Sequence, residues 1–168
     1  MRVYGSKISY FTGKLEAYLR YKGLDYERLP SPAHEKEIKA NAGAVQMPVV
    51  ERNDGRWMSD TTPIIQQLEK EHPNPTVLPS DAVVLFIALL IEDYADEWLW
   101  RTAMHYRWSY SHDRELLSSI IVDELLTHVP APRFLKRRLI QQRQRGGFVI
   151  RDGVRPETWD HVEAGYFA

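Results

Sequence analysis

The sequence contains no cysteine. Disulfide bonds, thiolate metal ligands and a protein thiol nucleophile are therefore all excluded. An excess of one charge is also missing, because the formal net charge is −1, which argues against a general nucleic-acid or membrane-surface role. The longest apolar run, residues 82–91, is too short to span a bilayer, and residues 1–10 have no apolar core of signal-peptide length. These absences predict a cytoplasmic protein.

The composition is that of an ordinary globular protein, with 43% hydrophobic and 27% charged residues among 168. This length is enough for one medium domain or two small ones. Pro73, Pro75 and Pro79 lie close together and mark a boundary in the chain. We therefore expect an α/β domain over residues 1–76 and an all-helical domain over residues 80–168.

The first domain alternates between strand and helix patterns. Strands are expected at residues 2–4 and 25–29, with helices at 12–22 and 35–42. Gly23 stands where a left-handed cap ends the first of these helices. Two strands separated by one helix form a parallel pair with a right-handed crossover.

Residues 46–72 form the most informative stretch. Pro48 opens a short apolar strand, which is a position that tolerates proline. Residues 53–55, Asn-Asp-Gly, form a tight turn into a second strand at 56–58. A helix follows, with Asp60 and Thr61 at its start and an end before Pro73. Its exposed N-terminus can hold an anion.

After residue 80 the pattern is helical throughout. A long helix is expected from about 81 to 110, a second over 112–127 and a third, strongly basic one over 132–145. Gly146 and Gly147 are expected to end the third helix. Residues 158–164 begin a fourth.

Several segments, in order and at suitable spacing, resemble the glutathione transferases. They are Ser9-Tyr10-Phe11-Thr12 before the first helix, residues 21–27 (Tyr-Lys-Gly-Leu-Asp-Tyr-Glu), Met47-Pro48-Val49-Val50, Asp60-Thr61, and residues 67–73. The resemblance implies a thioredoxin-like β-α-β-α-β-β-α domain followed by an all-α domain. It also implies a cis bond between Met47 and Pro48.

Two departures from the family pattern stand out. Asp60-Thr61 replaces the Glu-Ser of many members, which keeps the chemistry but shortens the acid. The helical part is shorter than the family's, and its late capping motif is not found. We therefore expect a truncated product or a fragment.

The resemblance implies glutathione as co-substrate and assigns its binding residues. The helix start at Thr61 would hold the γ-glutamyl carboxylate, and Asp60 would pair with the γ-glutamyl ammonium. The backbone of Met47, presented by Pro48, would pair with the extended cysteinyl unit. Lys14, a cation near a helix start, is easier to understand if an anion binds nearby, although it can also be a solvated lysine.

The thiol of glutathione must also ionise. Lowering a thiol pKa of ~8.5 by two units requires ~2.7 kcal/mol, whereas a helix dipole supplies ~0.3–1 kcal/mol. A hydroxyl hydrogen bond of ~1.5–3 kcal/mol closes the gap. Ser9, Tyr10 and Thr12 are the candidate catalytic hydroxyls. Ser9 is the first choice by position, with Tyr10 as the alternative.

The implied reaction is attack of the glutathione thiolate on a small electrophilic or hydrophobic substrate, by a homodimer without nucleic-acid, membrane or metal partners. The alternative is a non-catalytic glutathione-binding or protein-interaction scaffold of the same fold. The sequence leaves the acceptor substrate open.

Three further groups of residues suggest other kinds of site. Glu92, Asp93, Asp96 and Glu97, with His105, resemble a metal site, but a di-iron bundle needs Glu-x-x-His, which is absent, so we expect no metal. The aromatic residues between 94 and 110 are expected in the core and as cleft lining. The basic patch comprises Arg133, Lys136, Arg137, Arg138, Arg143 and Arg145. A solvated or partner-binding helix face explains that patch better than nucleic acid.

Overall fold

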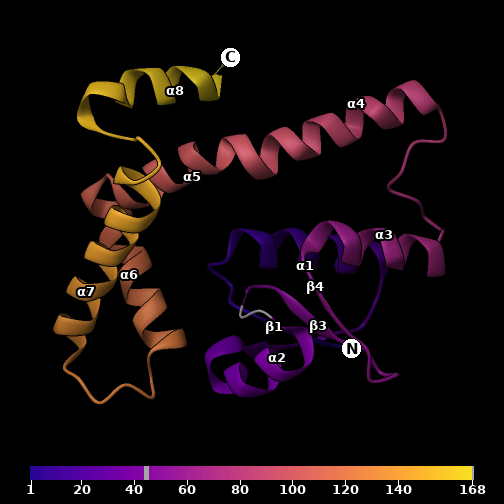
Figure 1. The fold of residues 1–168 in the computed structure, drawn as a ribbon, viewed down its shortest axis with the longest axis horizontal. Helices are drawn as coiled ribbons and strands as arrows, with labels where there is room; N and C mark the ends of the chain where they lie inside the picture. The colour runs from indigo at the N-terminus through magenta and orange to yellow at the C-terminus, as the bar shows by residue number, and fades with distance from the viewer. Residues whose placement is uncertain (44–45, 168) are drawn as a thin grey trace. The chain divides into compact units, whose positions relative to one another are not determined.

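The computed structural model describes residues 1–43 and 46–167 (Figure 1). The chain divides into two compact units. The first comprises Met1–Val77 with Glu124–His128, and the second comprises Leu78–Asp123 with the residues from Val129 onward. Each unit is described by itself.

The first unit is built on a four-stranded mixed sheet. Its strands are β1 (Arg2–Gly5), β2 (Glu27–Pro30), β3 (Val49–Glu51) and β4 (Trp57–Ser59). The spatial order is β2-β1-β3-β4. Strand β1 pairs in parallel with β2 and antiparallel with β3, and β3 pairs antiparallel with β4. The predicted thioredoxin-like order of strands and helices is confirmed.

Three α-helices accompany this sheet: α1 (Tyr10–Lys22), α2 (Glu35–Ala42) and α3 (Thr61–Glu71), with a short 3₁₀ turn, η1 (Ser31–His34), before α2. Because side chains alternate along a strand, the sheet has two apolar faces. On one face Val3 and Val50 pack in a cluster with Leu15 and Leu19 of α1 and with α3. On the other, Tyr4 and Val49 pack with Ile38 of α2. Both faces are therefore covered by helices.

Local signals placed the ends of these elements well. Gly23 closes α1 in the left-handed conformation, with φ 65°, as predicted. Gly55, with φ 81°, makes the predicted turn between β3 and β4. The start of α1 was misplaced: it begins at Tyr10 rather than residue 12, because the Ser9 side chain accepts a hydrogen bond from the Thr12 amide and so serves as the N-cap.

The second unit is helical, as predicted. Its α-helices are α4 (Ala82–Asp93), α5 (Leu99–Trp108), α6 (Ser111–Leu125), α7 (Arg133–Arg145) and α8 (Trp159–Phe167). Two π-helical turns, η2 (Tyr94–Trp98) and η3 (Gly146–Ile150), and a 3₁₀ turn, η4 (Pro156–Thr158), complete it. Within the described part of the chain, every helix is too short or too polar to cross a membrane.

Helix α7 ends at Arg145, as predicted, but Gly146 does not form a left-handed cap there. Gly146 keeps helical angles, φ −66° and ψ −44°, and the chain continues through the π turn η3. Val149 and Val154, 3% and 1% exposed, are buried beyond it. Glycine permits a left-handed cap but does not impose one, so burial of these valines accounts for the continued turn.

Candidate functional site

One row of paired residues across the sheet brings three candidate segments to the same edge. Tyr4 in β1 pairs with Val49 in β3, and Val49 pairs with Ser59 in β4. Because these strands run antiparallel, the end of β1, the start of β3 and the end of β4 meet there. The loop to Ser9, the Met47-Pro48 dipeptide and the Asp60-Thr61 helix start are the segments that adjoin this row. The register therefore gathers the predicted glutathione contacts at one edge.

The expected cis peptide bond between Met47 and Pro48 is present. Pro48 is buried and Met47 is half-buried, directly before β3. A second cis bond, Asn74-Pro75, was not expected.

Ser9 and Tyr10 stand at the start of α1. The Oγ of Ser9 accepts a hydrogen bond from the Thr12 amide at 3.3 Å. Since this bond uses a lone pair of the oxygen, the Ser9 O–H remains able to donate. Tyr10 is the first residue of the helix, and its ring meets that of Phe11 edge-on at 5.2 Å. Both candidate hydroxyls are half-buried.

Thr12, the third candidate hydroxyl, lies in the interior and is 0% exposed. It lies against Gly5 at the end of β1, where an added Cβ would come within 2.5 Å of the Thr12 Oγ1. That oxygen has no hydrogen-bond partner among the described residues. Gly5 is thus required by the close approach of α1 to the strand, and Thr12 is enclosed at this contact.

Lys14 does not occupy the helix position that its charge suggested. Because α1 begins at Tyr10, Lys14 lies in the second turn of the helix and is half-buried. The effect of the helix dipole on a side chain falls off within the first turn. The charge of Lys14 is therefore no sign that an anion binds nearby.

Asp60 forms the N-cap of α3 in a strained conformation. Its φ is 74° and its ψ is 128°, in a region that non-glycine residues rarely adopt. Its Oδ1 accepts a hydrogen bond from the Thr62 amide at 3.2 Å. Thr61 is buried, and within the described residues its amide has no hydrogen-bond partner. Strain of this kind is concentrated at ligand sites in proteins, and the Thr61 amide offers a donor to an anion.

The family model described as "Glutathione S-transferase, N-terminal domain" matches residues 3–76, which contain all eight candidate residues. Residues 3–76 are thereby identified as a glutathione S-transferase N-terminal domain. No curated protein sequence matches it significantly.

Several solved structures share the fold. The β-etherase LigF from Sphingobium sp. strain SYK-6 is 22% identical with a TM-score of 0.60, and the match covers 97% of this chain and 67% of that one. A glutathione transferase homolog from Burkholderia, solved with bound glutathione, is 18% identical with a TM-score of 0.50, covering 99% and 98%. A Zeta-class maleylpyruvate isomerase is 20% identical with a TM-score of 0.53. Its match covers 74% of this chain, which spans only 63% of the isomerase.

A buried ionic cluster around Glu69 was not predicted from the sequence. Glu69 Oε1 lies 2.5 Å from Lys22 Nζ and accepts a hydrogen bond from the Tyr18 hydroxyl at 2.8 Å. Its Oε2 accepts bonds from Thr76 Oγ1 at 2.9 Å and from the Val77 amide at 3.3 Å. Burial pushes the pKa of Glu69 upward, but these hydrogen bonds outweigh it and lower the pKa to about 2. The sequence feature that could have predicted this cluster is the position of Glu69 directly after Leu68, on the apolar side of α3.

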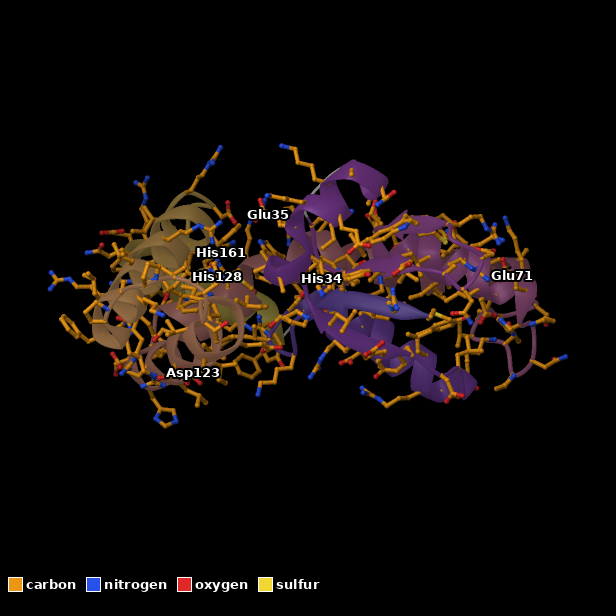
Figure 2. The ribbon with its side chains drawn as sticks, turned by 90° about the horizontal axis from the view of Figure 1, so that it is seen from below. His34, Glu35, Glu71, Asp123, His128 and His161 are labelled. Atoms are coloured by element: carbon orange, nitrogen blue, oxygen red, sulfur yellow. The ribbon has the colours of Figure 1, made fainter. Side chains whose placement is uncertain are left out.

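The Glu69 cluster joins α1 to the segment that follows α3. Lys22 Nζ also donates to the carbonyls of His72 and Pro75, each at 2.6 Å. Nearby, Arg52 pairs with Glu71 at the last residue of α3 at 2.5 Å (Figure 2). These contacts hold α3, and hence its N-terminus, against the rest of the first unit.

The possible metal site does not assemble. His105 is fully buried, with Nε2 2.9 Å from Glu163 Oε1 and Nδ1 2.8 Å from Ser109 Oγ, rather than beside residues 92–97. Tyr110 also donates to Glu163, and the pKa of that carboxyl is held low by the bonds from Tyr110 and His105. Over the described residues, no group of three or more potential metal-ligating side chains forms.

A cavity of about 450 Å³ in the first unit lies away from the candidate edge. It is lined by Met1, Leu24, Asp25 and the turn residues 52–54. Met1 precedes β1 and residues 52–54 follow β3, which places this cavity at the opposite end of the antiparallel pair. It therefore has no part in the candidate glutathione site.

Proposed function

We propose that this chain binds glutathione at the sheet edge next to the row Tyr4–Val49–Ser59 and activates the thiol for attack on a small electrophile. The single observation that carries the proposal is the strand register. It sets the end of β1, the start of β3 and the end of β4 side by side, and residues 9–10, 47–48 and 60–61 lie next in the chain to these strand ends. The glutathione bound in the Burkholderia homolog supports the same ligand.

In this proposal the α3 start recognises the γ-glutamyl group. The Thr61 amide donates to its carboxylate, and the exposed Asp60 carboxylate pairs with its ammonium. The backbone of Met47, just before the start of β3, pairs with the extended cysteinyl unit as an added strand would. The strained φ of 74° at Asp60 supports a role in ligand binding rather than capping alone.

Thiol activation is assigned to Ser9, with Tyr10 as the alternative. The Ser9 Oγ accepts from the helix, so its hydrogen is available to the thiolate. Such a bond favours the ionised thiol and lowers its pKa. Thr12 is the least suited of the three hydroxyls, because it is fully enclosed at the Gly5 contact.

We further propose that the protein is a cytoplasmic homodimer that associates through α4. A helix that is apolar all round is normally buried. None of the α4 residues is buried, and Phe86 is 65% exposed. Covering this helix with a second copy would remove that apolar surface from water.

Retention on immobilised glutathione and elution with free glutathione test the binding proposal. An aryl halide conjugation assay then separates an enzyme from a scaffold. We expect retention together with a rate above that of free glutathione. Retention without such a rate supports the non-catalytic scaffold, and no retention contradicts glutathione binding altogether.

A further inference from the structure

Helix α7 carries two kinds of arginine. Arg133 and Arg137 are paired with acids of α6: Arg133 Nη2 lies 2.7 Å from Asp123 Oδ2 (Asp123 is labelled in Figure 2), and Arg137 pairs with Glu115. Arg138 and Arg145, on the same helix, have no ion-pair or hydrogen-bond partner within the described residues. The paired arginines hold α7 against α6, whereas Arg138, Arg145 and the fifth arginine of the helix, Arg143, form no such pair within the described residues.

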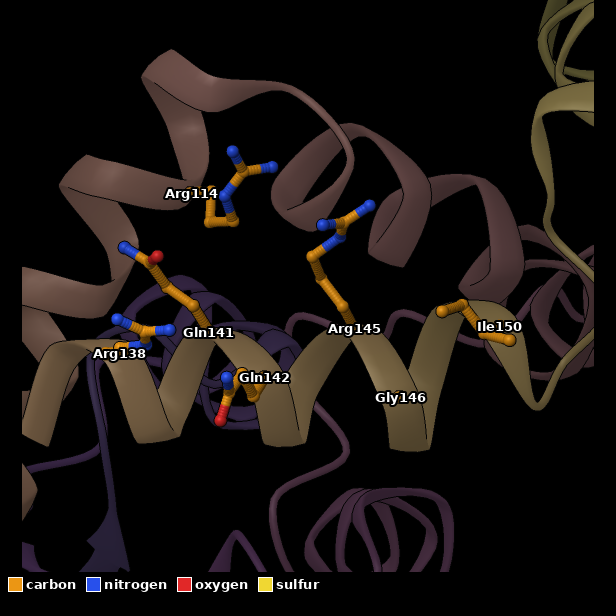
Figure 3. A pocket seen from close by; sticks show the side chains of 7 residues that line it. All are labelled: Arg114, Arg138, Gln141, Gln142, Arg145, Gly146 and Ile150. Carbon is orange, nitrogen blue, oxygen red and sulfur yellow. The ribbon is translucent and has the colours of Figure 1, made fainter.

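Arg138 and Arg145 line a cavity of about 430 Å³ inside the second unit (Figure 3). Its lining includes Arg114, Arg138, Gln141, Gln142, Arg145 and Ile150. In Figure 3, Arg145 and Gln141 project from α7 toward the helix that carries Arg114. The lining combines three guanidinium groups and two carboxamides and contains no acid. An acid that the lining contacts is Glu115, whose Oε1 accepts a hydrogen bond from Gln141 Nε2 at 3.2 Å and which pairs with Arg137 outside the lining.

Arg114 is held in place by the backbone. Its Nη1 donates to the carbonyl oxygens of Trp108 and Ser109, at 3.2 and 3.0 Å, where α5 ends. These bonds use part of a guanidinium that carries five N–H donors. The Arg114 guanidinium keeps its charge and its remaining N–H donors. The cavity therefore has one cation that the backbone holds in place, Arg114, and two that are not held in this way, Arg138 and Arg145.

We propose that this cavity binds a small organic anion with at least two negative groups, phosphoryl or carboxylate. Arginine forks match both groups with paired hydrogen bonds. The volume falls in the ~300–1,000 Å³ range of small-molecule sites, and Ile150 provides an apolar wall. A nucleic acid is a poorer fit, because the charges line a hollow, the whole chain is near neutral and Phe134 is the single aromatic residue of α7.

Calorimetric titration of the full chain at low ionic strength tests the site, with inorganic pyrophosphate and citrate as probes. Arg138→Gln and Arg145→Gln remove the two exposed lining charges. Arg143→Gln is the matched control, because Arg143 lies on the same helix outside the lining and loses the same charge. We expect each lining variant to weaken binding ~10-fold and the double variant ~50-fold. The control should bind as the wild type does.

Binding of pyrophosphate alone assigns the site to phosphoryl groups, and binding of citrate alone assigns it to carboxylates. The proposal is overturned if neither probe binds the wild type. It is also overturned if Arg143→Gln weakens binding as much as the lining variants, since binding would then follow net charge. Tight binding of a DNA duplex that pyrophosphate does not displace would overturn it in favour of a nucleic-acid surface.

Discussion

The Lys22 ammonium lies 2.5 Å from the Glu69 carboxylate and joins the end of α1 to α3. Because the Glu69 side chain is 5% exposed, replacing it with an uncharged group leaves Lys22 unpaired in a protected site. We expect Glu69→Gln to lower the free energy of unfolding at pH 7 by about 3 kcal/mol. Urea unfolding curves measure this difference.

The same pair predicts a pH dependence. The folded pKa of Glu69, about 2, is below its ordinary value of 4.5, so its stabilisation is fully present above pH 4.5 and disappears as the pH falls toward 2. The gap between wild type and Glu69→Gln should therefore close over that window. Glu35→Gln, at an exposed acid at the start of α2 (Figure 2), is the control and should change the free energy of unfolding far less than Glu69→Gln does. A gap that stays constant down to pH 2 would contradict the ionic origin.

Gly5 and Gly13 make a matched pair of glycines. A Cβ at Gly5 would meet Thr12 Oγ1 at 2.5 Å, whereas a Cβ at Gly13 would meet nothing within 4 Å. We expect Gly5→Ala to destabilise the protein by ~1–3 kcal/mol through overpacking and Gly13→Ala, inside α1, to stabilise it by up to ~1 kcal/mol. Adding Thr12→Ala to Gly5→Ala should restore part of the loss. Thermal unfolding of the four proteins checks the order of stability.

Ser9→Ala tests the assignment of the thiol-activating hydroxyl. It should leave glutathione affinity nearly intact, raise the pKa of the bound thiol by about one to two units, and slow aryl halide conjugation at pH 7 by ~10- to 100-fold. Part of that loss should return at higher pH, where the thiol ionises unaided. Tyr10→Phe is the control, and a larger loss in that variant would transfer the role to Tyr10.

Association through α4 is tested by charge insertion. Phe86 and Leu90 are 65% and 55% exposed on a helix without buried residues. Light scattering should find a dimer for the wild type and a monomer for Phe86→Glu and Leu90→Glu, because a buried unpaired carboxylate opposes association. Phe134→Glu, at a 73% exposed site on α7, should remain dimeric. A monomeric wild type would contradict the proposal.

Local signals in the sequence were enough to predict most of the first unit. Gly23, the turn at 53–55 and the Asp60 cap each act within a few residues, so their positions are readable without tertiary contacts. The predicted start of α1 was two residues too late. A serine such as Ser9 can either cap a helix or lie in the loop before it, and the sequence pattern is the same in both cases.

Tertiary partners could not be read in the same way. Glu69 and Tyr18 are 51 residues apart, and Arg137 and Glu115 are 22 apart. The charges in the sequence do not show which acidic residue forms an ion pair with which basic residue. The π turns of the second unit depend likewise on burial, as at Val149, rather than on a residue type that imposes them. Only the strand register shows that the candidate segments lie next to one row of the sheet, Tyr4–Val49–Ser59.

The role of Asp60 in ligand binding can be tested apart from its role as a helix cap, because Asp81 caps α4 in the same way. Asp60 accepts from the Thr62 amide, and Asp81 accepts from the Val83 and Val84 amides. Asparagine retains the capping oxygen but loses the charge. Asp60→Asn and Asp81→Asn should therefore have similar effects on stability, whereas glutathione, in the proposal, meets the carboxylate of Asp60 alone.

Calorimetric titration of glutathione into the wild type and these two variants tests the central claim most directly. We predict that the wild type and Asp81→Asn bind glutathione equally. Asp60→Asn should bind ~10- to 150-fold more weakly, the equivalent of a charged hydrogen bond worth ~1.5–3 kcal/mol. Equal binding by all three proteins, or no binding by the wild type, would contradict a glutathione site at the start of α3.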